Sequence, residues 1–436
     1  MGKIELKEGE VNGLLLSLMI IWLVALGFSI DGFMSYKVKM DTLASCVLPI
    51  SFLVLVRFFS ADLKNIHHLW IAYIIIAILQ IFTFYKWGWG NILISRFYAL
   101  AVCFLFASTI GIKSFLYHFE SAVVLLTKIS IILVIIVELF PFVHNLLTNI
   151  TFPPNGSVDF TIGIVGITKD ELGSNMYDNG FLIRRNTGFA WEPGRFAATI
   201  VVALLINLYR NKFQLFKKNF LILVIGLLST QSTTGLFAAL VCVVGYYINN
   251  KSVNKKKVSP IIKFTVIGGL IAFIFLSPFM VPKLQKIMNR DNWLDVNNTT
   301  VQMEDHWTPQ RIEGLFLESL NIADSPVVGY GEKVELSYVR RVLFPYLEIF
   351  LSNGLLSIIA SLGIPVAFFF YLCLWKSSKM LSELYQVKGE YLFFILLCMI
   401  NVSYDLFKEP LIMYMSLSSF FINSKDQIQW KKLKSQ

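Results

Sequence analysis

The chain has 436 residues, of which 56% are hydrophobic and only 15% are charged. Soluble domains carry roughly a quarter charged residues, so this composition excludes an ordinary soluble enzyme. The net charge of +10 does not indicate a nucleic-acid partner, because the lysines cluster in short loops between apolar runs, such as "YRNKFQLFKK" (Tyr209 to Lys218) and "NNKSVNKKK" (Asn249 to Lys257).

Apolar runs long enough to cross a bilayer recur along the chain and predict an all-α, polytopic integral membrane protein. About twelve segments are expected, one pair of them a short hairpin. They lie near residues 11–29, 42–60, 67–85, 92–111, 121–142, 191–209, 219–230, 234–249, 260–280, 350–375, 391–407 and 409–424. Basic loops favour the cytoplasmic side, so both termini are expected there.

This topology divides the chain into five parts, with two long loops on the outer face. The parts are N-terminal membrane helices (1–142), a first outer loop (143–190), central membrane helices (191–280), a large outer loop (281–349), and C-terminal membrane helices with a cytoplasmic tail (350–436).

The end of the first outer loop reads "RRNTGFAWEPGRF" (Arg184 to Phe196). Pro193 fits the first helical turn and Glu192 fits the cap before it. Arg195 lies one turn inside the helix, where an unpaired arginine costs about 2.5–3.5 kcal/mol at mid-bilayer. Guanidinium groups beside the N–H groups of a helix start suit a phosphate, so Arg185 and Arg195 are predicted to bind one.

The tip of the short hairpin is "STQSTTG" (Ser229 to Gly235), a hydroxyl-rich stretch at membrane depth. Irregular backbone is tolerated at that depth only where it is buried in protein or lines a wet cavity. The sequence leaves both possibilities open.

The large outer loop contains an amphipathic helix, "TPQRIEGLFLESL" (Thr308 to Leu320), with a Thr cap and Pro at the first helical position. Its predicted apolar face gathers Ile312, Leu315, Phe316 and Leu320. Arg311 falls on a different face, and Arg340 and Arg341 follow later in the loop. Arginines on the outer side do not serve orientation, and they favour bidentate phosphate recognition.

Four stretches together resemble one known family. "RNTGFAWEPGRFA" (Arg185 to Ala197) is similar to the R-x-x-G-x-x-x-E-P-x-x-x-A element of bacterial O-antigen polymerases (Wzy). "STQSTTGLFAAL" (Ser229 to Leu240) follows where that family has its Ser-(Arg/Thr)-(Thr/Gly)-Gly stretch. "RIEGLFLESLNIADSPVVGYG" (Arg311 to Gly331) resembles its Arg, short helix and hP-x-x-GxG element, and "YLEIFLSNGLLS" (Tyr346 to Ser357) resembles its next helix start.

The resemblance implies a GT-C-like, metal-independent glycosyltransferase of the bacterial inner membrane, with its active site facing the periplasm. Its substrates would be oligosaccharide repeat units on undecaprenyl diphosphate, joined into O-antigen or a related surface polysaccharide. A chain-length-regulating membrane protein and membrane lipids are the expected partners. No cofactor, metal or nucleic acid is expected, and the five cysteines, all inside apolar runs, predict neither disulfides nor a zinc site.

The resemblance also implies roles for individual residues. The pyrophosphate ligands would be Arg185, Arg195 and Arg311, with Arg340 or Arg341 as a fourth. The two candidates for the general base are Glu192, which alternatively orients Arg195, and Glu348, whose apolar setting would raise its pKa.

The chain departs from the family at one position. Related ligases and many polymerases place a His-Asn pair before the last element, whereas this chain reads "VLFPYLEIF" there. His306, in "EDHWTP", is a further candidate to reach the site, although a lone loop histidine is more often solvated.

Three other functions remain as alternatives. The stretch "WEPG" favours a polymerase over an O-antigen ligase, which shares the fold. A lipid-linked oligosaccharide flippase would spread its basic residues along several helices. A non-catalytic scaffold would leave the outer arginines unexplained.

Overall fold

The protein is described by a computed structural model that covers residues 66–87, 92–140, 142–143, 158–161, 165–168, 185–190, 192–215, 217–253, 306–307, 311–331, 334–345, 348–349, 351, 353–407 and 409–422. The chain divides into two compact units. The first unit comprises residues 1–60, 113–286 and 382–396, and the second comprises residues 61–112, 287–381 and 397–436.

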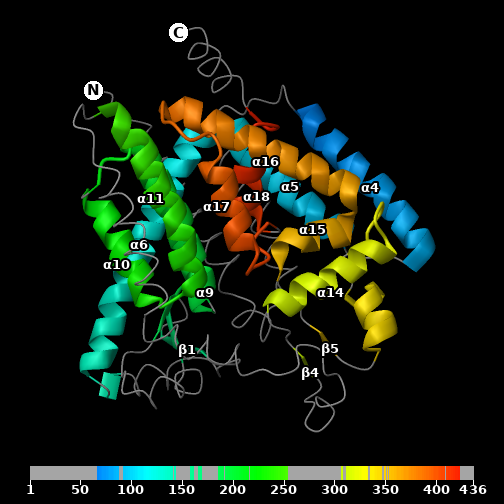
Figure 1. Ribbon diagram of the computed structural model, residues 1–436, viewed down its shortest axis with the longest axis horizontal. Coiled ribbons are helices and arrows are strands. Elements are labelled where there is room, and N and C mark those ends of the chain that lie inside the picture. The colour runs from blue at the N-terminus through cyan, green and yellow to red at the C-terminus, as the bar shows by residue number, and fades with distance from the viewer. Residues whose placement is uncertain are drawn as a thin grey trace, which may run out of the picture. The chain divides into compact units, whose positions relative to one another are not determined.

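The described residues are mostly helical, as the sequence predicts (Figure 1). In chain order the elements are α4 (Ile66–Trp87), α5 (Ile92–Thr109), α6 (Gly111–Leu139), β1 (Val158–Thr161), β2 (Val165–Thr168), β3 (Asn186–Gly188), α9 (Pro193–Arg210), α10 (Lys218–Ser229), α11 (Thr233–Val253), β4 (His306–Trp307), α14 (Arg311–Asp324), the 3₁₀-helix η3 (Val334–Leu336), the π-helix η4 (Val339–Leu343), β5 (Glu348–Ile349), α15 (Gly354–Leu362), α16 (Ile364–Tyr385), α17 (Leu392–Asn401) and α18 (Pro410–Leu417). The strands form one antiparallel sheet, β1-β2-β3, and one parallel pair, β4-β5.

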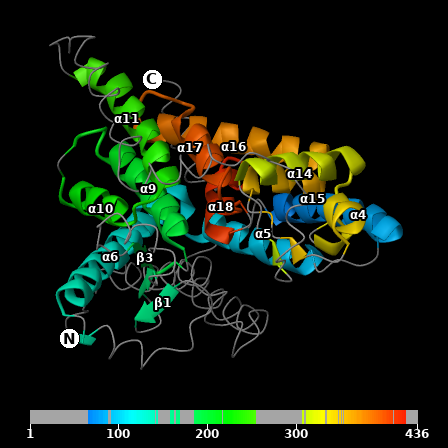
Figure 2. The same cartoon turned by 60° about the horizontal axis from the view of Figure 1, so that its bottom comes forward.

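Helix α9 is the core of the first unit. It packs against both α10 and α11 (Figure 2), and every residue from Pro193 to Tyr209 except Arg195 is buried. A helix that is buried on all sides needs an apolar sequence throughout, which "PGRFAATIVVALLINLY" supplies. Close packing is helped by Gly235, where an added Cβ would lie 2.6 Å from the Cβ of Ala197.

Helix α6 carries an outward-facing apolar stripe. Its exposed large side chains recur at helical spacing: Leu125, Ile129, Ile132, Ile135 and Leu139. Among the described residues, α6 is the one helix that is both long and apolar enough to cross a membrane, judged by length and composition. Shorter apolar stretches lie in α4, α5, α10, α11 and α17.

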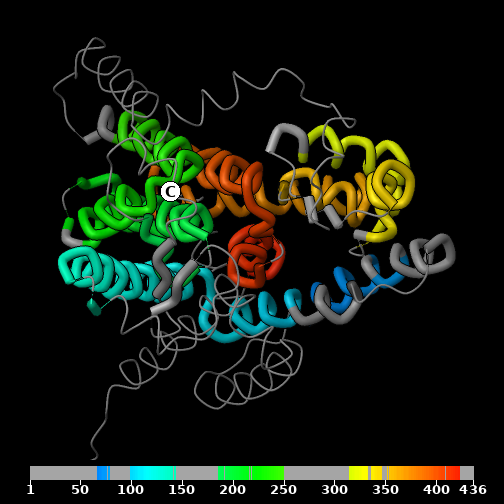
Figure 3. Tube along the Cα trace, turned by 90° about the horizontal axis from the view of Figure 1, so that it is seen from below, coloured from blue at the N-terminus to red at the C-terminus, as the bar shows by residue number. Residues whose placement is uncertain are grey.

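In the second unit, α5 packs side by side with both α4 and α18 (Figure 3). The α5–α18 contact includes Phe106 stacked on Tyr414, with ring centroids 5.9 Å apart. Both rings are fully buried. This contact joins residues about 300 positions apart in the chain and fixes α18 against α5.

The apolar run 350–375 was expected to form one membrane segment, and this prediction is wrong. The chain instead bends at Gly363, where φ is +82° and α15 gives way to α16. The bend is held from outside: the N–H of Ile364 donates to the carbonyl of Pro326 at 2.8 Å. A Cβ at Gly363 would lie 1.9 Å from the carbonyl oxygen of Val327, so only glycine allows this approach.

The stretch "SPVVGYG" (Ser325 to Gly331) covers the end of α15. The N–H groups of Tyr330 and Gly331 donate to the carbonyls of Ala360 and Ser361 at 2.9 and 3.0 Å. Those carbonyls belong to the last turn of α15, which has no intrahelical donors for them. The glycines of this motif therefore allow the loop to come close enough to donate hydrogen bonds to the last carbonyls of α15.

Replacing Gly329 with alanine is expected to destabilise the second unit by about 2 kcal/mol or more. Gly329 has φ +69°, and a Cβ there would lie 2.3 Å from the backbone carbonyl oxygen of Ser361. The matched control is Gly314→Ala in α14, where a Cβ meets nothing within 4 Å and alanine favours the helix by about 0.5–1 kcal/mol. Melting temperatures of the detergent-purified variants measure the difference, and equal values would contradict this account of the motif.

Most of the other segment boundaries agree with the sequence. The expected ranges 67–85, 92–111, 191–209, 219–230 and 234–249 match α4, α5, α9, α10 and α11 to within a few residues. Three ranges are exceptions: α6 begins ten residues before 121–142, and α17 and α18 end six and seven residues before the ends of 391–407 and 409–424. The segments expected at 11–29, 42–60 and 260–280 lie outside the described residues.

Candidate functional site

The stretch that precedes α9 lies against the tip of the α10–α11 hairpin. The Nε of Arg185 donates to the carbonyl of Thr230 at 3.2 Å, and its Nη2 donates to the carbonyl of Gln231 at 3.4 Å. We call Arg185 to Arg195, together with the tip residues Ser229 to Ser232, the junction site. Two stretches separated by about 45 positions are thus joined through one guanidinium group.

Asn186 fixes the junction site from inside and is fully buried. Its Oδ1 accepts from the hydroxyl of Ser130 in α6 and from the N–H of Gly188. Its Nδ2 donates to the hydroxyl of Ser229 at 2.9 Å. Buried polar groups are stable only when hydrogen-bonded, and Asn186 meets this condition with three different segments. Sequence reasoning missed Asn186, although it lies beside Arg185 in the same motif.

The hydroxyl groups of the hairpin tip hold its own backbone. The hydroxyl of Thr230 donates to the carbonyl of Leu227 at 2.7 Å, and the Oγ of Ser232 accepts from the N–H of Gly235 at the start of α11. Thr230 is fully buried and Ser232 is 2% exposed. Ser229, Gln231, Thr233 and Thr234 of the same tip are only partly buried. The hydroxyls act as local caps for the helix ends.

Glu192 occupies the N-cap position of α9, with extended backbone at φ −139° and ψ 134°. The predicted cap is only partly correct, because the carboxylate accepts no hydrogen bond from the first turn of the helix. Pro193 does occupy the first turn, as predicted. The N–H of Arg195 donates to the backbone carbonyl of Glu192 at 3.1 Å. Both side chains are half-buried.

The remaining predicted arginines belong to the second unit, in α14 and η4. Arg341 forms an ion pair with Asp324 at 3.0 Å, and both side chains are partly exposed. The Nη1 of Arg340 donates to the carbonyl of Phe344 at 3.1 Å. Arg311 is the first residue of α14, and its side chain lies outside the described part of the chain.

The buried face of α14 differs from the predicted one. Leu317, Glu318 and Asn321 are buried, whereas Phe316 is 49% exposed. The reason is a polar contact with η4: the Oδ1 of Asn321 accepts from the N–H of Val339 at 3.0 Å, and its Nδ2 donates to Glu318 at 3.0 Å. The predicted face, which counts only apolar side chains, is therefore rotated by about one residue from the face that is buried in the structure.

Apolar contacts complete the attachment of η4 to α14. Leu317 and Val339 form a buried cluster, with Leu320, Phe344 and Leu351 packed against it. The arginine-bearing turn is therefore fixed beside the helix that begins at Arg311.

The second candidate base, Glu348, lies in the parallel pair β4-β5. The strand register aligns His306 with Glu348 and Trp307 with Ile349. The stretch around Glu348, "VLFPYLEIF", contains no histidine. The strand register nevertheless places the backbone of His306 next to that of Glu348. Their side chains lie outside the described part of the chain.

The described elements thus bring the four motif stretches together in pairs. The stretch from Arg185 meets the hairpin tip in the first unit. The stretch that ends at Gly331 meets α15 in the second. Within the described residues, no group of three or more His, Cys, Asp or Glu side chains is arranged to hold a metal.

No protein-family model matches the chain, and no curated protein sequence does.

Proposed function

We propose that this chain is a polytopic glycosyltransferase of the bacterial inner membrane. It joins undecaprenyl-diphosphate-linked oligosaccharide repeat units into O-antigen or a related surface polysaccharide. Both termini lie in the cytoplasm, and the reaction takes place at the periplasmic face. The observation that carries this proposal is the pair of hydrogen bonds from Arg185 to the hairpin tip. The Arg185 stretch and the hairpin tip are two of the four stretches that resemble the polymerase family, and these bonds hold them in contact.

Membrane insertion is supported by large apolar side chains on outward faces. Helix α6 presents its stripe of leucine and isoleucine, and α16 presents Ile364, Phe368 and Trp375 at 40–69% exposure. Extended apolar surfaces of this kind mark contact with a partner or a membrane. Together with the recurring apolar runs of the sequence, they favour a bilayer.

In the proposed reaction, the bond between the anomeric carbon of the growing chain and its diphosphate oxygen breaks. A new bond forms to a hydroxyl at the non-reducing end of the incoming repeat unit. Undecaprenyl diphosphate leaves with the bonding electron pair, and the hydroxyl proton passes to a carboxylate. Each cycle therefore consumes two lipid-linked glycans and releases one lipid diphosphate.

The arginines bind the diphosphate and stabilise the negative charge that develops on it as the bond breaks. We assign this role to Arg185, Arg195 and Arg311, with Arg340 or Arg341 as a fourth. Arg185 has a second role, because two of the five N–H donors of its guanidinium hold the hairpin tip.

Glu192 and Glu348 are the proton acceptors that we propose. Glu192 lies directly before α9, three positions from Arg195, and its side chain is half-buried. It serves either as the base or as the group that orients Arg195. The backbone of His306 is in register with that of Glu348 in the parallel pair β4-β5.

The experiment that tests this function is a polymerisation assay with the full chain in liposomes. The donor and acceptor are both undecaprenyl-diphosphate-linked repeat units from the native host, and EDTA is present. The expected product is a ladder that grows by one repeat unit, with one lipid diphosphate released for each step. Transfer only to added lipid A-core would identify a ligase instead, and the absence of any glycan product would reject the proposal.

A further inference from the structure

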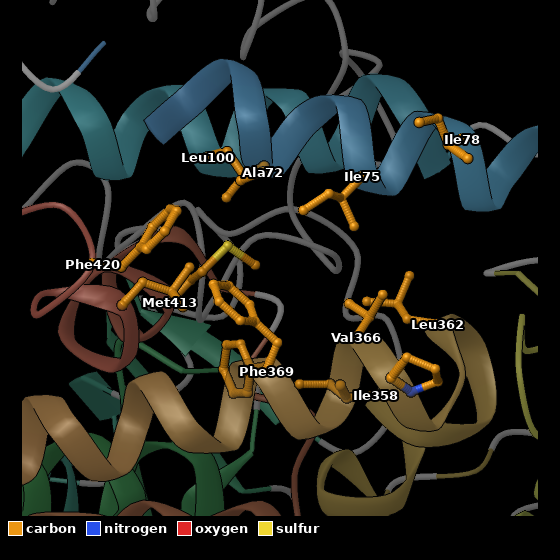
Figure 4. Close-up of a pocket in the computed structure, with 13 residues that line it drawn as sticks. Ala72, Ile75, Ile78, Leu100, Ile358, Leu362, Val366, Phe369, Met413 and Phe420 are labelled. Carbon is orange, nitrogen blue, oxygen red and sulfur yellow. The ribbon is translucent and has the colours of Figure 1, made fainter. Parts of the chain in front are cut away.

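The second unit contains a cavity of about 430 Å³ between α4 and α5 on one side and α15, α16 and α18 on the other (Figure 4). Ala72 and Ile75 of α4 face Val366 and Phe369 of α16 across it. All thirteen lining residues are apolar. The volume lies in the range of natural ligand sites, roughly 300–1,000 Å³.

Water is a poor occupant of this cavity. A buried water needs two to four polar partners, and the lining side chains offer none. An empty cavity of this size would also forfeit many packing contacts, since protein interiors are normally close-packed. The chemistry of the lining therefore selects a hydrocarbon.

The mouth of the cavity is continuous with the exposed apolar surface of the unit. Ile75, Ile78 and Phe369 line the cavity and are also 45%, 50% and 40% exposed, whereas Leu100 and Met413 are buried at its floor. In a bilayer, a hydrocarbon chain reaches such a mouth from the lipid phase without crossing water.

The helix α15 connects this cavity to the arginine-bearing elements. Ile358 and Leu362 line the cavity from α15. The same helix packs against α14, which lies alongside it in Figure 1 and which holds η4 with Arg340 and Arg341. The apolar cavity and the cationic segment are thus connected through two packed helices, α15 and α14, and an amphipathic molecule with a phosphate head and a hydrocarbon tail fits this arrangement.

We propose that the cavity binds the isoprenoid chain of the lipid-linked substrate, close to its diphosphate end. This inference rests on the proposed function for the identity of the substrate. The cavity itself sets the chemistry of the ligand, a long chain without polar groups that enters from the membrane.

The test is to fill the cavity and measure lipid binding. Val366→Trp places an indole inside the cavity, and Leu372→Trp places one on the outer surface of the same helix, where Leu372 is 38% exposed. If Val366→Trp does not fold, Ala72→Trp fills the cavity from the opposite wall. The probes are undecaprenyl phosphate and dioleoylphosphatidylglycerol, each titrated against the detergent-purified full chain and counted by native mass spectrometry.

The expected result is that Val366→Trp weakens undecaprenyl phosphate binding by about tenfold or more, while Leu372→Trp leaves it unchanged. Phosphatidylglycerol binding stays the same in both variants. A parallel loss of both lipids would assign the cavity to bilayer lipid and overturn the proposal, as would unchanged undecaprenyl phosphate binding.

This measurement separates the cavity from the enzyme activity. If the unmutated chain forms no ladder in the polymerisation assay but Val366→Trp still loses undecaprenyl phosphate binding, the cavity stays assigned and the polymerase is rejected. A ladder that forms normally together with undiminished binding in Val366→Trp would leave the polymerase standing and reject the cavity.

Discussion

Replacing Arg195 with alanine is expected to lower polymer synthesis by about 10²–10³-fold, the usual cost of losing one donor that stabilises transition-state charge. Arg195 is a half-buried cation one turn from the start of α9, and all other residues from Pro193 to Tyr209 are buried. Alanine is the best helix former, so α9 is expected to keep its structure. Glycan ladders from cells that carry the variant, normalised to its level in the membrane, measure the effect.

Two further variants separate charge from geometry. Arg195→Lys keeps the positive charge but loses the planar fork that binds phosphate at two points, so an intermediate loss is expected. Lys212→Ala removes an exposed cation beyond the opposite end of α9 and is expected to leave the ladder unchanged. A full-length ladder from Arg195→Ala at normal protein level would remove Arg195 from the catalytic scheme.

Replacing Arg210 with alanine is expected to destabilise the first unit by about 3–5 kcal/mol, the cost of leaving a buried charge without its partner. Glu120 of α6 is fully buried and forms an ion pair with Arg210 of α9. It also accepts from the Nδ2 of Asn207 at 2.6 Å and from that of Asn219 at 3.4 Å. The guanidinium of Arg210 lies 4.3 Å from the ring centroid of Tyr117, which adds a cation–π contact.

The destabilisation has an internal control. Combining Arg210→Ala with Glu120→Gln is expected to restore most of the stability, because a neutral amide needs no counterion. The exposed pair of Arg341 and Asp324 is the matched comparison, and Asp324→Ala is expected to cost about 0–1 kcal/mol. Melting temperatures of the purified variants measure all three. Equal losses for Arg210→Ala and Asp324→Ala would show that Glu120 is not held as a buried charge.

The pair of Glu120 and Arg210 also explains an error in the sequence prediction. The segment was expected to begin at residue 121, because Lys113 and Glu120 interrupt the apolar pattern. In the structure α6 begins at Gly111 and includes both residues. Lys113 lies over the ring of Tyr385 at 5.9 Å, and Glu120 is neutralised by Arg210. A hydropathy scale assigns each charged residue a fixed value. It does not account for a partner that a distant helix supplies.

The hairpin and the start of α9 could be predicted because local chemistry determines them. Proline at the first turn, basic flanks and a hydroxyl-rich turn each act within a few residues, and α9, α10 and α11 begin within about two residues of the expected positions. The bend at Gly363 could not be predicted in this way. It depends on the carbonyls of Pro326 and Val327, which lie almost forty residues away.

The residues of the candidate site could be predicted from the sequence better than the contacts between them. The sequence identifies Arg185 and the hairpin tip separately, but the bonds between them, and the role of Asn186, follow only from the fold. For α14 the apolar pattern predicts a helix and misplaces its buried face, because Asn321 and Glu318 occupy the contact with η4. Polar residues with buried partners are the common source of these differences.

The most direct test of the proposed function is a gel of surface lipopolysaccharide from the native host with this gene deleted. If the chain is the polymerase, units are still made, flipped and ligated but not joined, and the gel shows core carrying a single repeat unit. Bare core would contradict the proposal and indicate a ligase or a flippase. An unchanged ladder would show that the chain has no part in O-antigen assembly.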